Sequence, residues 1–163
     1  MKKNDFQSKI NPESDFFGKL VNWSHGWREF NIWHYGIALS DNAIFDTGSG
    51  LQIFEPTFTP KIVIGVEQTH LPAHQTIDRL IHALDVFSNW SYGLLGWNCE
   101  HLARLIATDD PISYEVLKSP PPIPQLNGNG RNLVAKKIFH AHLGLTNPEL
   151  LTRNYLYRSR VIS

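Results

Sequence analysis

IWHYGIALSDNAIFDT, the stretch from residue 32 to residue 47, has the pattern of a β-hairpin. Its first half is rich in aromatic and β-branched residues, residues 40–42 are polar, and a second apolar run follows them. Side chains alternate between the two faces of a strand, so His34 shares its face with the small residues Gly36 and Ala38. The stretch therefore predicts an antiparallel hairpin whose histidine has space around it for another group to approach.

A second informative stretch, NCEHLARLIA at residues 98–107, predicts a helix that begins at or just before Cys99. Its apolar residues recur at helical spacing, at Leu102, Leu105 and Ile106. Backbone N–H groups at a helix N-terminus stabilise anions, so this position favours a thiolate and helps to hold an oxyanion. A lone cysteine is more often a small buried hydrophobe, and only its combination with a histidine on a facing strand indicates a nucleophile.

Composition indicates a globular protein of a reducing compartment. The 163 residues, 42% of them hydrophobic, fit one domain with a single core. The 15 basic and 15 acidic residues cancel, which disfavours nucleic acid as a partner. The single cysteine excludes an internal disulfide, and a metal site of His34, Cys99 and His101 would have an unusual ligand set, so neither metal nor cofactor is expected. The polar N-terminus and the lack of an apolar run of about 18 residues predict a cytoplasmic location.

The remaining elements follow from periodicity and turn residues. Ser24–Trp27 is expected to be a turn or flap, residues 49–60 a flexible connection, and Thr76 a helix cap. The other expected strands and helices are Lys19–Trp23, Lys61–Glu67, Gln75–Phe87 and Asn132–Leu143. Together these elements predict an α+β fold in which an antiparallel β-sheet packs against helices.

Four segments are expected along the chain. They are a polar N-terminal segment at 1–15, the main domain at 16–118, a proline- and glycine-rich linker at 119–130, and a C-terminal helical extension at 131–163 that packs on the domain. Chemistry-bearing residues concentrate in the main domain.

Two stretches together resemble the lecithin retinol acyltransferase family, which includes the H-Ras-like suppressor phospholipases and acyltransferases. NCEHL at residues 98–102 is similar to the family's Asn-Cys-Glu-His-Phe signature, and HYGIAL at residues 34–39 is similar to its histidine strand. The similarity covers roughly residues 16–107 and keeps the family's order of histidine before cysteine. It implies a permuted papain-like fold of the NlpC type.

The resemblance also implies roles for individual residues. Cys99 is the expected nucleophile and His34 its general base, and the third position falls on Asp46, where acyltransferase members usually carry a second histidine. An aspartate can orient the imidazole and stabilise its cation in the same way. Tyr92 and Asn98 are expected to support the oxyanion or the thiol, and for Tyr92 an equal alternative is that it anchors the loop before the helix.

The side chain of Asp46 can contact His34 only if both side chains lie on the same face of the hairpin. Residues directly opposite each other share a face, and in one register all opposite pairs have the same sum of residue numbers. The sum of 34 and 46 is even, so His34 and Asp46 share a face only in a register whose pairs have an even sum. A three-residue loop at 40–42, with Leu39 opposite Ala43, satisfies this condition, and so does a β-bulge. A simple two-residue turn would place Asp46 on the wrong face.

Three functions remain open at this point. The first is a thiol-dependent acyltransferase, or a phospholipase A-like or thioesterase-like hydrolase, acting on an acyl-bearing small molecule or lipid. The second is a cysteine peptidase or amidase of the NlpC type, and the third is a binding or regulatory module without turnover. A lipid substrate would involve peripheral membrane contact through Trp23, Trp27, Phe30 and Trp33, although core packing is favoured for Trp33. The oligomeric state does not follow from the sequence.

Overall fold

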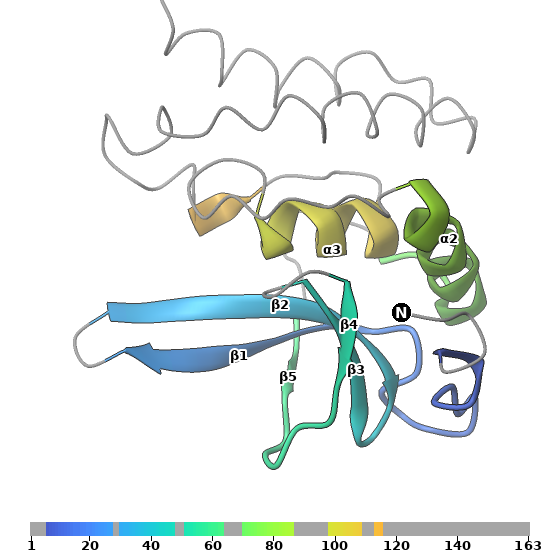
Figure 1. The fold of residues 1–163 in the computed structure, drawn as a ribbon, viewed down its shortest axis with the longest axis horizontal. Helices are drawn as coiled ribbons and strands as arrows, with labels where there is room; N and C mark the ends of the chain where they lie inside the picture. The colour runs from blue at the N-terminus through green and yellow to red at the C-terminus, as the bar shows by residue number, and fades with distance from the viewer. Residues whose placement is uncertain are drawn as a thin grey trace, which may run out of the picture.

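The chain forms an α+β structure with one five-stranded antiparallel sheet of order β4-β3-β2-β1-β5 (Figure 1). The computed structural model describes residues 6–27, 30–47, 51–63, 70–86, 98–108 and 113–115, with the backbone alone for 25–27, 30–32 and 86. The elements in this described part are β1 (Leu20–Trp27), β2 (Phe30–Ser40), β3 (Ala43–Asp46), β4 (Gln52–Phe54), β5 (Lys61–Ile62), α2 (Ala73–Val86) and α3 (Cys99–Ala107). Neither of these two helices is long and apolar enough to cross a membrane.

The main core lies between the sheet and the two helices: α3 lies over the sheet, and α2 lies beside α3 at the end of the sheet (Figure 1). Helix α3 packs on β2 and against α2, and all of its residues are buried. Burial of a large apolar side chain contributes about 1.5–3 kcal/mol. The fully buried members of this core include Leu20, Ile37, Leu39, Phe45, Leu80, Leu102 and Leu105.

The β2–β3 hairpin contains a bulge that sets the face of every residue in β3. Ser40 pairs with Ala43 across a two-residue turn, whereas the next pair along the hairpin is Ala38 with Ile44. The prediction that Leu39 lies opposite Ala43 is therefore wrong, and the β-bulge alternative is confirmed. The bulge changes the pairing sum from odd to even, so Asp46 lies on the same face as His34.

Strand β1 is longer than the sequence predicts. Ser24–Trp27, expected to be a turn or flap, continues the strand and pairs residue by residue with Phe30–Trp33. The small and polar residues at these positions suggested a turn, but the neighbouring β2 supplies a ladder partner for each of them. The two strands therefore form a long arm that projects beyond the rest of the sheet (Figure 1).

Two further boundaries differ from prediction. Residues 49–60, expected to be a connection, contain β4, which is too short to give a clear periodic pattern. Helix α2 begins at Ala73, and the backbone N–H of Thr76 donates to the carbonyl of Pro72 at 3.0 Å. Thr76 therefore lies in the first turn and is not the cap.

The N-terminal segment is attached to the domain from residue 6 onward. Phe6 is buried in the main core, and the backbone N–H of Asn11 donates to the carbonyl of Leu39 at 2.9 Å. The predicted linker at 119–130 and the extension at 131–163, including its expected helix, lie outside the described residues.

Gly18 holds the start of α2 against the strand layer, and we expect Gly18→Ala to destabilise the fold by about 2–3 kcal/mol. Its φ is +69°, and an added Cβ would lie 2.6 Å from both the Cα and the carbonyl oxygen of Ala73. A lowered midpoint of urea unfolding with an unchanged m-value would verify this. Lys19→Ala, at the exposed neighbouring position, serves as control, and equal midpoints for the two variants would contradict the prediction.

Candidate active site

His34 and Asp46 form the polar pair at the end of the β2–β3 hairpin. Nε2 of His34 hydrogen-bonds to Oδ1 of Asp46. The backbone N–H of Thr47 donates to the same carboxylate oxygen at 2.6 Å, and Nε2 of Gln52 donates to the other oxygen at 3.0 Å. Gln52 reaches the carboxylate because β4 places it directly opposite Asp46. The carboxylate is thus fixed on both sides while it orients the imidazole.

Gly36 allows β3 to approach β2 closely at this point. A Cβ on Gly36 would lie 2.5 Å from the carbonyl oxygen of Phe45 and 2.6 Å from Cγ2 of Ile44. The expectation of open space beside the histidine is therefore wrong, because β3 and the ring of Trp23 fill it. The Trp23 and His34 rings meet edge to face with centroids 4.9 Å apart. Gly36 thus allows the backbone before Asp46 to come within reach of His34.

Cys99 occupies the first helical position of α3, as the sequence predicts. Asn98 caps the helix: its side-chain oxygen accepts from the backbone N–H of His101, and its backbone N–H donates to Nδ1 of His101, both at 3.2 Å. This reciprocal capping explains why the helix starts here. The positive end of the helix dipole consequently lies at Cys99 and stabilises negative charge there.

The structure brings the three predicted catalytic residues together. His34 hydrogen-bonds to the Cys99 thiol as well as to Asp46. Burial lowers the pKa of the imidazole, but the hydrogen bonds to Asp46 and Cys99 and the charges of both groups outweigh it and raise the pKa to about 10. The imidazole therefore holds its proton throughout the neutral range.

The site is enclosed. Cys99 is only 2% exposed and belongs to the main core, whereas 14% of the His34 side chain is accessible. A substrate reaches the sulfur only if the covering residues move. The same enclosure excludes water and strengthens the electrostatic interactions between thiol, imidazole and carboxylate.

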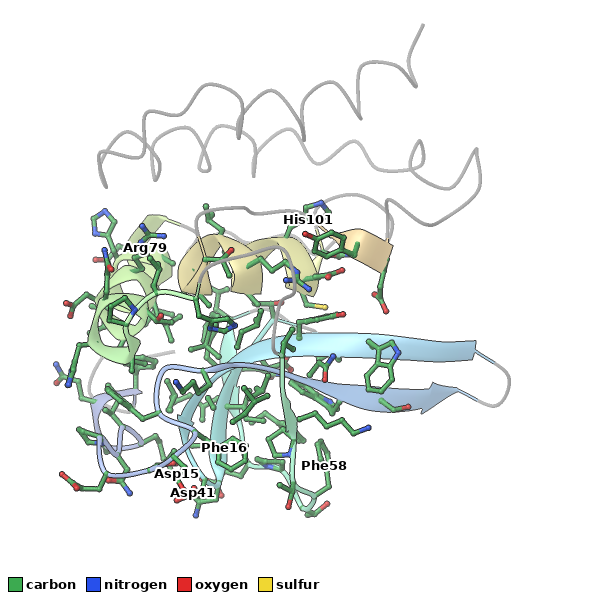
Figure 2. All side chains as sticks on the ribbon, turned by 180° about the vertical axis from the view of Figure 1, so that it is seen from behind. Asp15, Phe16, Asp41, Phe58, Arg79 and His101 are labelled. Carbon is green, nitrogen blue, oxygen red and sulfur yellow. The ribbon has the colours of Figure 1, made fainter. Side chains whose placement is uncertain are left out.

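The other residues of the signature have structural contacts. His101 takes part in the cap and lies on the far side of α3 from the sheet (Figure 2). Glu100 is fully buried, accepts from Nε of Arg104 at 2.9 Å and accepts from the hydroxyl of Ser113 at 2.7 Å. Asn98, expected to support the oxyanion, caps the helix and donates to the Ser113 hydroxyl at 3.2 Å.

Several predicted participants are not placed at the site. Tyr92 lies outside the described residues, as do the side chains of Trp27 and Phe30. Trp23 is 6% exposed and offers no docking surface, and Trp33 packs partly buried against the core. In the described part of the chain, no group of three histidine, cysteine or acidic residues could hold a metal ion.

Two contacts at the site were not predicted. Gln52, which holds Asp46, falls in a stretch without periodicity, and Glu115 accepts a hydrogen bond from the backbone N–H of Trp33 at 3.0 Å across 82 positions of sequence. Local pattern gives no signal for either contact.

Comparisons of the chain with models of protein families, with curated proteins and with solved structures found no match. The function therefore has to be inferred from the residues of the site.

Proposed function

We propose that this chain is a thiol-dependent acyl-transfer enzyme with a permuted papain-like fold. Cys99 is its nucleophile, His34 its proton carrier and Asp46 the residue that orients the imidazole. The proposal is carried by one observation: a single imidazole hydrogen-bonds both to a fixed carboxylate and to the thiol of a helix N-terminal cysteine. A buried cysteine that only fills space needs no such partner, so the nucleophile interpretation is favoured over the buried hydrophobe.

The first half of the reaction forms a thioester. The Cys99 thiolate attacks the carbonyl carbon of the acyl donor, and the electron pair of the C=O bond moves to oxygen, where the N-terminal end of α3 stabilises it. The intermediate collapses, the C=O bond re-forms and the bond to the leaving group breaks. The leaving group takes its proton from the His34 imidazolium, which becomes neutral.

The second half releases the acyl group. Neutral His34 accepts a proton from water, or from an alcohol or amine acceptor, as that group attacks the thioester carbonyl. Collapse of this second intermediate expels the Cys99 thiolate and restores the ion pair. Attack by water gives hydrolysis, and attack by an acceptor gives transfer.

Incubation with a short-chain phosphatidylcholine or a short-chain acyl thioester, followed by intact-mass measurement, tests the proposal. We expect one acyl adduct on the wild type and none on Cys99→Ala, because only the thiolate can carry the acyl group. Iodoacetamide labelling of the untreated wild type is the control that the thiol can be reached.

Other outcomes of this experiment would contradict the proposal. Cleavage of peptide or amide substrates without an acyl adduct from lipid or thioester would favour a peptidase or amidase. A thiol that reacts with iodoacetamide at neutral pH no faster than free cysteine would favour a module without turnover.

A further inference from the structure

We infer that Glu115 is a positioning residue that fixes His34 relative to Cys99, through a polar bracket formed by Glu100, Ser113 and Glu115. The inference rests on the proposed function and adds to it a residue that acts through the position of His34. The bracket joins the helix that carries the nucleophile to the strand that carries the histidine.

The bracket begins on α3, at the residue after the nucleophile. One carboxylate oxygen of Glu100 accepts from the Ser113 hydroxyl at 2.7 Å and from the backbone N–H of Glu115 at 3.2 Å. Its other oxygen accepts from Arg104, whose guanidinium lies 4.7 Å from the centroid of the Tyr114 ring. Glu100 and Arg104 are both buried, so these contacts compensate charges that would be costly without partners. Residues 113–115 are consequently held against α3 by both charged side chains.

The bracket ends on β2, at the residue before the histidine. Oε1 of Glu115 accepts from the backbone N–H of Trp33 at 3.0 Å. Among the described residues, β3 pairs with β2 only from Ile37 onward, so the carboxylate provides at Trp33 the acceptor that a neighbouring strand would otherwise supply.

The electrostatics of Glu115 agree with this placement. The pKa of its carboxyl is raised, mainly by burial and further by the charge of Glu100. The hydrogen bond from Trp33 and the charge of His34 act in the opposite direction and lower this pKa. The Glu115 carboxylate therefore lies within electrostatic reach of both the helix residue Glu100 and the catalytic imidazole.

The bracket contacts the two catalytic elements at adjacent residues: Glu100 follows Cys99, and Trp33 precedes His34. A shift of β2 relative to α3 that separated the imidazole from the thiol would also stretch the Glu115–Trp33 hydrogen bond, so this bond opposes the shift. Shifts of about 1 Å in reacting groups can cost about a hundredfold in rate.

Three substitutions at Glu115 test the inference through the rate of Cys99 alkylation by iodoacetamide between pH 5.5 and 10. Glu115→Ala removes the acceptor, and we expect about tenfold slower alkylation at pH 6.5, with kcat lowered more than KM is changed. Glu115→Gln keeps an oxygen acceptor at the same distance and should restore the wild-type pH profile. Glu115→Asp keeps the charge but is one methylene too short to reach Trp33, and it should resemble the alanine variant.

The matched control is Glu55→Ala, which removes an exposed carboxylate that pairs with Lys9. Wild-type alkylation of Glu115→Ala, or a Glu115→Gln variant as slow as Glu115→Asp, would overturn the inference. If Glu115→Ala does not fold, the alkylation rates of Glu115→Gln and Glu115→Asp are sufficient to test the inference. Slow, His34-independent alkylation in the wild type would instead mean that the proposed function has failed.

Discussion

Replacement of His34 by glutamine is expected to lower kcat/KM for the acyl donor by about 10³-fold or more. In the proposed mechanism the imidazole carries the proton to the leaving group, and the side-chain amide of glutamine cannot do this because it does not ionise in this pH range. Because the imidazolium of the free enzyme has a pKa of about 10, kcat/KM should stay constant through the neutral range and fall as the pH rises through that value. The variant should show no such alkaline limb.

Alkylation of the thiol gives a second measurement that needs no substrate. At pH 6.5 we expect His34→Gln to react with iodoacetamide about tenfold more slowly or worse, because a cysteine without a cationic neighbour is only about 1% ionised there. His74→Gln, at an exposed position of α2, is the matched control. Equal alkylation rates in the wild type and His34→Gln would rule out the ion pair and with it the assigned role of the histidine.

The second large effect is expected from Gly36→Ala, which adds one methyl group between β2 and β3. The new Cβ would collide with the Phe45 carbonyl, and this backbone atom cannot turn away as a side chain can. We expect a loss of about 1–3 kcal/mol of unfolding free energy, and a shift in Tm of about 2–4 °C per kcal/mol for a chain of this size. Because β3 moves away from His34, activity should fall by about a hundredfold or more.

A second variant separates the loss of activity from the loss of stability. Ile44→Val removes the Cδ1 methyl group of the same residue and should cost about 0.5–1.5 kcal/mol, but it keeps Cγ2, the atom nearest to Gly36, and leaves the approach of β3 intact. Its kcat should remain near that of the wild type, whereas Gly36→Ala should resemble Asp46→Asn in kcat. If Gly36→Ala keeps wild-type kcat and Tm, the close approach has no part in positioning Asp46.

The elements that carry the site could be predicted because each has a strong local pattern. Apolar and aromatic residues around His34 indicate a strand, and the helical spacing after Asn98, together with its capping side chain, locates the start of α3 within one residue. The condition that joins Asp46 to His34 could also be stated in advance, because it depends only on the alternation of side chains.

The features that could not be predicted depend on contacts between distant segments. Residues 24–27 look like a turn by composition and become a strand because β2 pairs with them. Gly36 suggests an opening, but β3 fills the space in the folded chain. The carboxylate of Glu115 accepts a hydrogen bond from Trp33, 82 positions away in the sequence, and no local sequence pattern indicates such a contact. Tertiary packing decides all three.

The bulge at Leu39 also limits how this hairpin can change in evolution. Removal or addition of one residue between Ala38 and Ile44 would turn Asp46 to the opposite side of the sheet, whereas a change of two would return it. Insertions and deletions in this short connection can therefore accumulate only in pairs if the carboxylate is to stay with its histidine.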